Sequence, residues 1–239
     1  MLASVVGVRT PVLQATLERR LLLTYRLDPD AVADLVPGPF WLHMVGGFAV
    51  GSITLDHVTA LRPRGLPAAA GFTSQNAAHR IAVEWDQHGR KAAGTFVLSR
   101  HTSARRIAVA GDRLFPGLRM RADFDVDDRG PNVSVGFRGS DGSAVDAEVV
   151  VDDDVGRSEL FSAPQEGWRL AVRGAMTASL RRKAGELDWI DEHARGGRVR
   201  AASIERVTSS LFSAALGTPD SAIVARDVMI EWQAALPPR

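Results

Sequence analysis

The chain has 239 residues, of which 45% are hydrophobic and 24% are charged, a composition typical of a water-soluble globular protein with a substantial core. Its net charge of +1 provides no bulk field that would draw it to nucleic acid or to a membrane surface. It contains no cysteine, which excludes disulfides, cysteine nucleophiles and thiolate metal sites.

The first residues, 1–14, are mildly apolar but lack the basic start and the long apolar stretch of a secretory signal peptide. No apolar run approaches the roughly 20 residues that a membrane-spanning helix needs. We therefore expect a cytoplasmic protein with no membrane and no nucleic acid among its partners. No linker, composition shift or internal repeat divides the sequence, so we expect a single domain over residues 1–239.

The stretch 24–39 combines the end of a strand with a short helix. Residues 17–27 divide with a period of two into a largely apolar face and a more polar face, which predicts a strand. Asp28 is a good N-cap because its carboxylate can accept from free N–H groups of the first turn, and Pro29 suits the first helical position. Pro37 then ends the helix.

The remaining pattern predicts many short strands and few helices. Turn residues and alternating apolar positions favour strands at 49–58, 77–86, 92–100, 118–126, 132–138, 143–151, 168–182, 198–210 and 221–233. We expect loops at 62–76 and at 188–197 (the latter with some helix), an amphipathic helix at 102–117, and a short helix with a loop at 156–167. This order predicts a β-rich α+β fold, in which a mostly antiparallel sheet curls into a barrel or cone with a few short helices.

The common cofactor and metal motifs are absent from the sequence. Counting a calcium loop from Asp125 puts Arg129 at position five and Gly136 at position twelve, where an oxygen ligand and a glutamate are needed. No HExxH, phosphate-binding loop or GxSxG segment occurs. The six histidines include no close pair, so only histidines from distant strands could form a metal site. We expect no metal and no cofactor.

The opening segment resembles the strand and helix that begin the acetoacetate decarboxylase superfamily. The residues that carry the resemblance are Tyr25, Arg26, Asp28, Ala31, Val36, Pro37 and Pro39. Segments 62–67, 104–117 and 206–224, together with the strand through Arg80, are similar to an uncharacterised bacterial branch of that superfamily. The resemblance covers most of the chain and implies a β-cone fold around a buried pocket.

The decarboxylases of this superfamily use a lysine of lowered pKa that attacks a ketone to form a Schiff base. That lysine follows a proline after a helix, but the corresponding place here, 115–119, reads FPGLR. The only lysines are Lys91 and Lys183, which we expect to be solvated. The pocket carboxylate should fall near Gln75 or Asn76, and neither is acidic. We therefore expect this scaffold without Schiff-base chemistry.

Arginines and a few acid–base groups remain as candidate site residues. Arg20 lies near the position of an arginine that, by the resemblance, binds the substrate carboxylate, and Arg80 and Arg100 are further candidates because an arginine fork can bind a carboxylate with two hydrogen bonds. Glu84 and His101 are the candidates for proton transfer. Arg80 and Glu84 share a strand face about 13 Å apart, so they do not form a direct pair. Alternatively, all of these residues lie on solvated strand faces.

We predict that the protein binds and transforms a small carboxylate- or carbonyl-containing metabolite in a buried pocket by acid–base or electrostatic catalysis. The alternative is a noncatalytic small-molecule binding protein on the same scaffold. A purely structural interaction protein is a third possibility, although no long exposed apolar or charged stretch favours it. Because sheet edges are often covered by self-association, we also expect a homo-oligomer.

Overall fold

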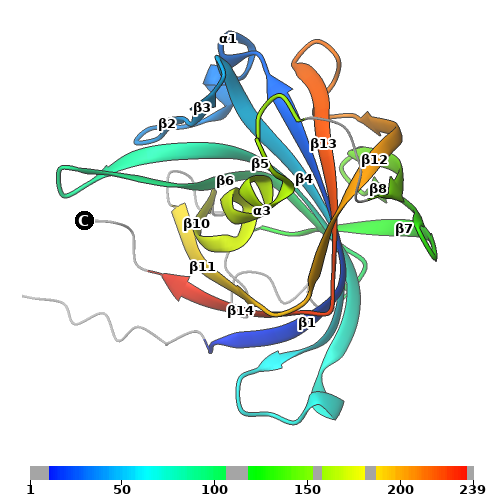
Figure 1. Ribbon diagram of the computed structural model, residues 1–239. Coiled ribbons are helices and arrows are strands. Elements are labelled where there is room, and N and C mark those ends of the chain that lie inside the picture. The colour runs from blue at the N-terminus through cyan, green and yellow to red at the C-terminus, as the bar shows by residue number, and fades with distance from the viewer. Residues whose placement is uncertain (1–10, 106–117, 153–157, 181–186, 236–239) are drawn as a thin grey trace, which may run out of the picture.

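The computed structural model describes residues 11–105, 118–152, 158–180 and 187–235. These residues form one 14-stranded sheet that curls into a ring, with α3 lying inside the ring in the view of Figure 1. Most strand pairs are antiparallel. The parallel pairing of β10, which lies at one end of the strand order, with β6 closes the sheet into the ring. The expected β-rich α+β fold with a curled sheet is confirmed.

The elements follow one another along the chain with short connections between most neighbours. They are β1 (Leu13–Leu27), α1 (Pro29–Val32), the 3-10 helix η1 (Ala33–Leu35), β2 (Trp41–Leu42), β3 (Met44–Val45), β4 (Phe48–Pro63), the 3-10 helix η2 (Ala68–Ala70), β5 (Phe72–Gln87), β6 (Arg90–Thr102), β7 (Met120–Arg129), β8 (Asn132–Gly139), β9 (Ala144–Val151), α3 (Pro164–Val172), β10 (Arg173–Leu180), β11 (Leu187–Arg195), β12 (Arg198–Ser209), β13 (Gly217–Arg226) and β14 (Val228–Ala235).

Strand β1 lies at the centre of the sheet. One edge pairs with β4 over nearly its whole length, and the other pairs with β14 and then β13. Its side chains alternate between two faces, as a period of two requires. Leu21, Leu23 and Tyr25 enter the main hydrophobic core, whereas Leu22 on the other face packs with Ala171 of α3.

The main core is rich in aromatic rings. Phe40, which follows the first helix, contacts Trp85, Phe96 and Trp189 with ring centroids 5.4 to 5.9 Å apart. The helix itself begins as predicted, since the Asp28 carboxylate accepts a hydrogen bond from the Asp30 backbone nitrogen. The predicted strand and capped helix at the start of the chain are therefore confirmed, and they place Phe40 against the core.

Four predicted elements differ from the structure. Residues 72–76 of the predicted loop at 62–76 already belong to strand β5. Residues 168–172 are helical rather than extended, because α3 begins at Pro164 and packs Ala171 against Leu22 and Ile223. Residues 188–197 form most of strand β11 and the turn after it rather than a loop with some helix. The predicted strand 221–233 is two strands, since Asp227, with a φ of 58°, interrupts it between β13 and β14, which follow one another in the same direction along one edge of β1.

Some expectations fall on segments that the structure does not describe. Most of the predicted helix at 102–117 and Lys183 lie outside the described residues. Within the described ranges, no helix has the length and apolar character needed to cross a membrane. The same ranges contain no group of three or more His, Asp or Glu side chains arranged to hold a metal ion.

His79 gives the core a dependence on pH. Its ring is fully buried between the Ser99 and Ser209 hydroxyls, 3.0 and 3.1 Å from its two nitrogens. Burial, and then the neighbouring His101, lower its pKa from 6.5 to about 3. The folded protein therefore keeps this ring neutral at pH values where the unfolded chain binds a proton.

We expect the free energy of unfolding to fall as pH decreases below about 6.5, because the unfolded state then binds more protons than the native state. His79 should account for about 2 kcal/mol of loss between pH 7 and pH 5, at about 1.4 kcal/mol per pH unit. Urea unfolding of His79→Gln and of the wild type at both pH values measures this difference. The half-exposed His193→Gln serves as the control, and an equal pH dependence for His79→Gln and wild type would contradict the assignment.

Candidate functional site

A cavity of about 70 Å³ lies on the sheet face that carries Arg20. Its walls come from β1, β4, β5, β6, β10, β11 and β14, together with Arg119 just before β7. The charged and polar lining residues are Arg20, Thr54, Asp56, Asn76, Arg80, Arg100, His101, Arg119, Thr177 and Glu192. This concentration of charge on the inner side of a curled sheet makes the cavity the candidate site.

A second, wider groove of about 840 Å³ runs beside β12 and β13. Small and weakly polar side chains form most of its wall, and Asp220 is the only charged residue in its described lining. The Asp220 carboxylate already accepts hydrogen bonds from the Ser158 hydroxyl and the Glu159 backbone nitrogen. The one charged side chain in the described lining of this groove therefore already has hydrogen-bond partners.

Arg20 is held between two carboxylates inside the cavity wall. Its Nε and Nη2 atoms donate to the two Asp56 oxygens at 2.9 and 2.7 Å, and Nη1 donates to Glu192 Oε1 at 2.7 Å. Arg20 and Asp56 are direct neighbours across the β1–β4 pair, which places both side chains on one face. Burial acts to lower the pKa of Arg20, but Asp56 and Glu192 raise it above its ordinary value. Arg20 is therefore permanently charged and links Asp56 of β4 to Glu192 of β11; we call these three residues the Arg20 brace.

Glu192 connects this brace to two other side chains. Its Oε2 atom accepts a hydrogen bond from the Trp232 indole at 2.9 Å and lies 3.9 Å from Arg80 Nη2. Burial acts to raise the pKa of Glu192, but the charges of Arg20 and then Arg80 hold it below its ordinary value. Glu192 is therefore an anion that accepts hydrogen bonds from one side and balances positive charge on the other.

Arg80 has hydrogen-bond donors without partners. The residue is only 6% exposed, and its Nε and Nη1 atoms have no hydrogen-bond partner among the described residues. Burial and the nearby charge of Arg20 lower its pKa, while Glu192 opposes this effect. Buried donors without partners are costly, typically by about 1–3 kcal/mol each. A carboxylate in the cavity would satisfy one of these atoms, because a guanidinium binds a carboxylate with two parallel hydrogen bonds along its Nε–Nη2 edge or its Nη1–Nη2 edge.

Two further arginines make the cavity strongly cationic. Arg100, on the same face of the β5–β6 pair as Ala78, donates from Nη1 to the Ser179 hydroxyl at 2.9 Å. Burial lowers its pKa well below the ordinary value, and the like charges of Arg119 and Arg80 add to the effect. The surroundings of Arg100 thus penalise its positive charge, and an anion in the cavity would relieve that penalty.

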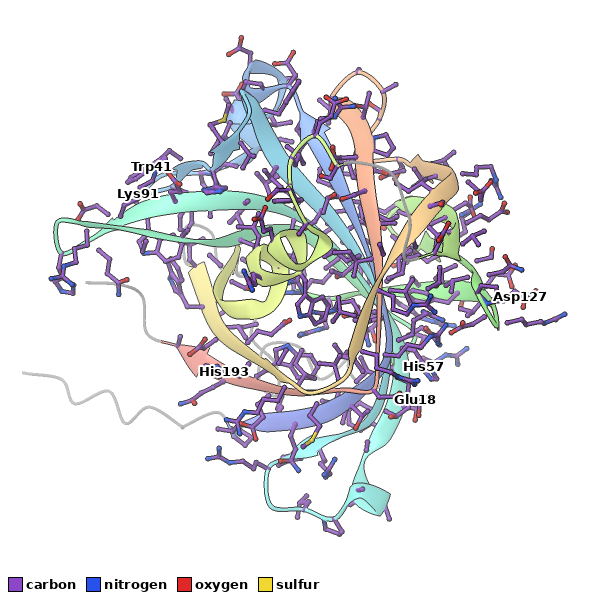
Figure 2. All side chains as sticks on the ribbon, viewed as in Figure 1. Glu18, Trp41, His57, Lys91, Asp127 and His193 are labelled. Carbon is purple, nitrogen blue, oxygen red and sulfur yellow. The ribbon has the colours of Figure 1, made fainter. Side chains whose placement is uncertain are left out.

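Glu84 does not line this cavity. Its carboxylate accepts from the Trp41 indole at 2.9 Å and lies 2.6 Å from His43 Nδ1 and 2.5 Å from Lys91 Nζ. It thereby fastens the segment containing β2 to the β5–β6 hairpin, and Trp41 and Lys91 lie close together at this rim in Figure 2. Burial acts to raise the pKa of Glu84, but these bonds lower it, with Lys91 the strongest.

His101 borders the cavity, but its imidazole has partners on the other side of the sheet. It pairs across the strands with Ala77, one position away from the Arg100 pair, so the pleat turns its side chain to the opposite face. The ring lies 4.8 Å from that of Phe137, and Nε2 is 3.0 Å from Asp141 Oδ1. Its Nδ1 is buried without a hydrogen-bond partner in the described structure.

The three predicted arginines therefore line one cavity, whereas Glu84 lies elsewhere and His101 only borders it. Sequence reasoning missed Asp56, Glu192, Trp232 and Arg119 as lining residues. Asp56 had a detectable signal, since Ser52, Thr54 and Asp56 alternate as a polar row along one strand face. Glu192 lies in the segment that was predicted to be a loop, and its role could not be found from local pattern.

Breaking the Arg20 brace should destabilise the fold. We expect Asp56→Asn to lower the free energy of unfolding by about 3–5 kcal/mol, because it leaves a buried guanidinium without its main counter-ion. Asp227→Asn is the matched control, since Asp227 pairs with Arg198 at 2.7 Å while both side chains are more than half exposed. Its effect should stay within about 1 kcal/mol. Urea unfolding measures both, and equal small effects would show that the brace contributes little.

The fold is shared with solved structures at low sequence identity. The enduracididine biosynthesis enzyme MppR, complexed with pyruvate, is 11% identical with a TM-score of 0.61, covering 97% of this chain and 91% of that one. An acetoacetate decarboxylase-like enzyme from Sphingomonas wittichii is 15% identical with a TM-score of 0.58, covering 95% of this chain and 92% of that one.

Acetoacetate decarboxylase from Legionella pneumophila is 10% identical with a TM-score of 0.60, covering 98% of this chain and 92% of that one. Comparison of the sequence with known protein families gives no match, and neither does comparison with curated proteins. The likeness thus rests on three-dimensional structure, and it confirms the resemblance seen in the opening segment at the level of the fold. The chain shares the fold of these acetoacetate decarboxylase-like enzymes.

Proposed function

We propose that this protein binds a small carboxylate- or carbonyl-containing metabolite in the cavity and transforms it without a Schiff base. The observation that carries the proposal is the pair of unsatisfied donors on buried Arg80. Folding has removed these donors from water at a free-energy cost, and a ligand carboxylate that binds one edge of the guanidinium would recover part of it. The positive charges of Arg100 and Arg119 favour the same kind of ligand.

The size of the cavity supports a ligand of only a few atoms. One water molecule needs about 10–15 Å³ of cavity volume, measured in the same way as the volume of this cavity. The observed 70 Å³ therefore suits a molecule of about the size of a short carboxylic acid. MppR, which has the same fold, is described as complexed with pyruvate, an acid of this size. We use pyruvate as the first probe for that reason.

In the proposed chemistry, the cationic wall stabilises negative charge that develops on a ligand oxygen in the transition state. Arg80 holds the ligand carboxylate, and Arg100 and Arg119 face the same small volume. A lysine nucleophile is not part of the proposal. Lys91 is the only lysine in the described ranges, and it is 64% exposed and paired with Glu84 away from the cavity.

The second candidate function is noncatalytic binding of the same class of ligand. It is favoured by the positions of the two predicted proton-transfer groups. Glu84 is occupied by Trp41, His43 and Lys91, and the His101 ring rests against Phe137 on the other sheet face. A binder needs only the arginine wall, whereas an enzyme also needs a group that moves a proton at the ligand.

Arg80→Gln should weaken ligand binding at least tenfold, because a hydrogen bond to a charged group contributes about 1.5–3 kcal/mol. Isothermal titration with pyruvate on the wild type and the variant measures this change. Arg138→Gln is the matched control, since Arg138 is 62% exposed and lies outside the cavity. Urea unfolding without ligand shows whether the variant is folded. Pyruvate binding that is unchanged in Arg80→Gln would overturn the proposed site.

Turnover separates the two candidate functions. If the protein is an enzyme, we expect water in the cavity to take a methyl proton of pyruvate while the arginines stabilise the enolate oxygen, and deuterium oxide to return a deuteron to the same carbon, as followed by proton NMR. Borohydride treatment with the same acid should leave the protein mass unchanged, because no imine forms. A stable mass adduct on a lysine would refute the chemistry proposed here. Binding without exchange or turnover across a set of short oxo acids would favour the noncatalytic candidate.

A further inference from the structure

The cavity changes in polarity along the direction of its strands. On β4, the lining residues run from Thr54 and Asp56 to Val58 and Leu61. Val58 and Leu61 belong to a separate hydrophobic cluster, against which Trp232 packs. Arg80 pairs across the strands with Ser52, which lies beyond Thr54 in the opposite direction. One end of the cavity is therefore cationic and the other end is apolar.

Trp232 lies where these two ends meet. It is the direct cross-strand neighbour of Glu192 in the β11–β14 pair and of Leu13 in the β1–β14 pair. Its indole donates to Glu192 Oε2 at 2.9 Å, and the same oxygen lies 3.9 Å from Arg80 Nη2. One carboxylate oxygen thus spans the space between the indole and the guanidinium. A ligand held by Arg80 therefore reaches the indole within a few bonds.

We propose that Trp232 is a specificity-determining residue that limits the length of the ligand. This inference rests on the proposed function, in which Arg80 holds the carboxylate, and it defines the ligand class as a short monocarboxylate with an uncharged hydrocarbon end. That end lies against Val58, Leu61 and Trp232. A second carboxylate there would have no charged partner among these side chains, and burying it would be costly.

The hydrogen bond to Glu192 gives the indole a second role. This hydrogen bond fixes the plane of the indole ring and occupies Glu192 Oε2, the oxygen that lies 3.9 Å from Arg80. Trp232→Phe keeps most of the apolar wall but removes this hydrogen bond, so it should alter carboxylate affinity more than length preference. Trp232→Ala removes the wall itself. The two variants therefore separate positioning from length selection.

The test uses isothermal titration with the series acetate, propionate, butyrate, valerate and hexanoate. For the wild type, we expect affinity to rise about fourfold with each added methylene until the indole is reached, and then to fall. In Trp232→Ala the best acid should be longer by at least two carbons, while Trp232→Phe keeps the wild-type optimum. Arg80→Gln should weaken all five acids by a similar factor.

The control variant is Trp41→Ala, which removes an indole from β2 that is 44% exposed, donates to Glu84 and does not line the cavity. It should leave the preferred length unchanged. If Trp232→Ala does not fold, Trp232→Leu and Leu61→Ala shorten the same wall and should also shift the optimum towards longer acids.

The outcomes distinguish the two levels of the proposal. Acids that bind through Arg80 but keep the same optimum in Trp232→Ala and in the substitute variants would overturn the role of Trp232 and leave the binding site intact. If no acid binds the wild type, or if binding is independent of Arg80, the proposed function fails and the length selection fails with it. A dicarboxylate such as succinate that binds more tightly than butyrate would also overturn the assigned ligand class.

Discussion

The buried pairing of Arg20 with Asp56 and Glu192 is the interaction on which the candidate site depends. It joins β1, β4 and β11. Asp56 is 36 positions and Glu192 is 172 positions from Arg20 in the sequence. Removing ions from water costs several kcal/mol each, and only good geometry offsets this cost. Here each guanidinium nitrogen has a carboxylate partner within 2.9 Å. The three strands are therefore held with their charged faces towards one small cavity.

The two oxygens of Glu192 give the two buried arginines different properties. Oε1 bonds directly to Arg20, whereas Oε2 is occupied by Trp232 and lies 3.9 Å from Arg80. Arg20 accordingly has a raised pKa and a complete set of partners, and Arg80 has a lowered pKa and two unsatisfied donors. Residue type does not distinguish the fully paired arginine of this wall from the one with unsatisfied donors. The two arginines differ in how many neighbouring carboxylate oxygens accept hydrogen bonds from them.

What could be predicted from the sequence depends on whether a feature is determined by neighbouring residues or by partners on distant strands. The Asp28 cap and the alternation along β1 depend on neighbouring residues, so the opening strand, the first helix and the β-rich class were predictable. Strand β11 was missed because it turns Asp188 and Glu192 into the interior, which removes the polar-outward pattern expected of a strand. Arg20 and Arg80 could be nominated together, but their partners lie on distant strands. No local pattern shows which arginine keeps free donors.

The sheet separates the parts of the sequence that fix the fold from those that fix the chemistry. On β5 and β6, Ala78 and Arg100 lie on the cavity face, while the neighbouring Ala77 and His101 also border the cavity but turn their side chains towards the core, where the His101 ring contacts Phe137. Substitutions on the cavity face outside the pairing of Arg20 with Asp56 and Glu192 can change its charge without disturbing the core packing on the other face. This is consistent with one fold shared at 10% to 15% identity. The shared fold therefore does not determine what lines the cavity, and in the proposed function the buried arginines, with Glu192 and Trp232 beside them, select its ligand.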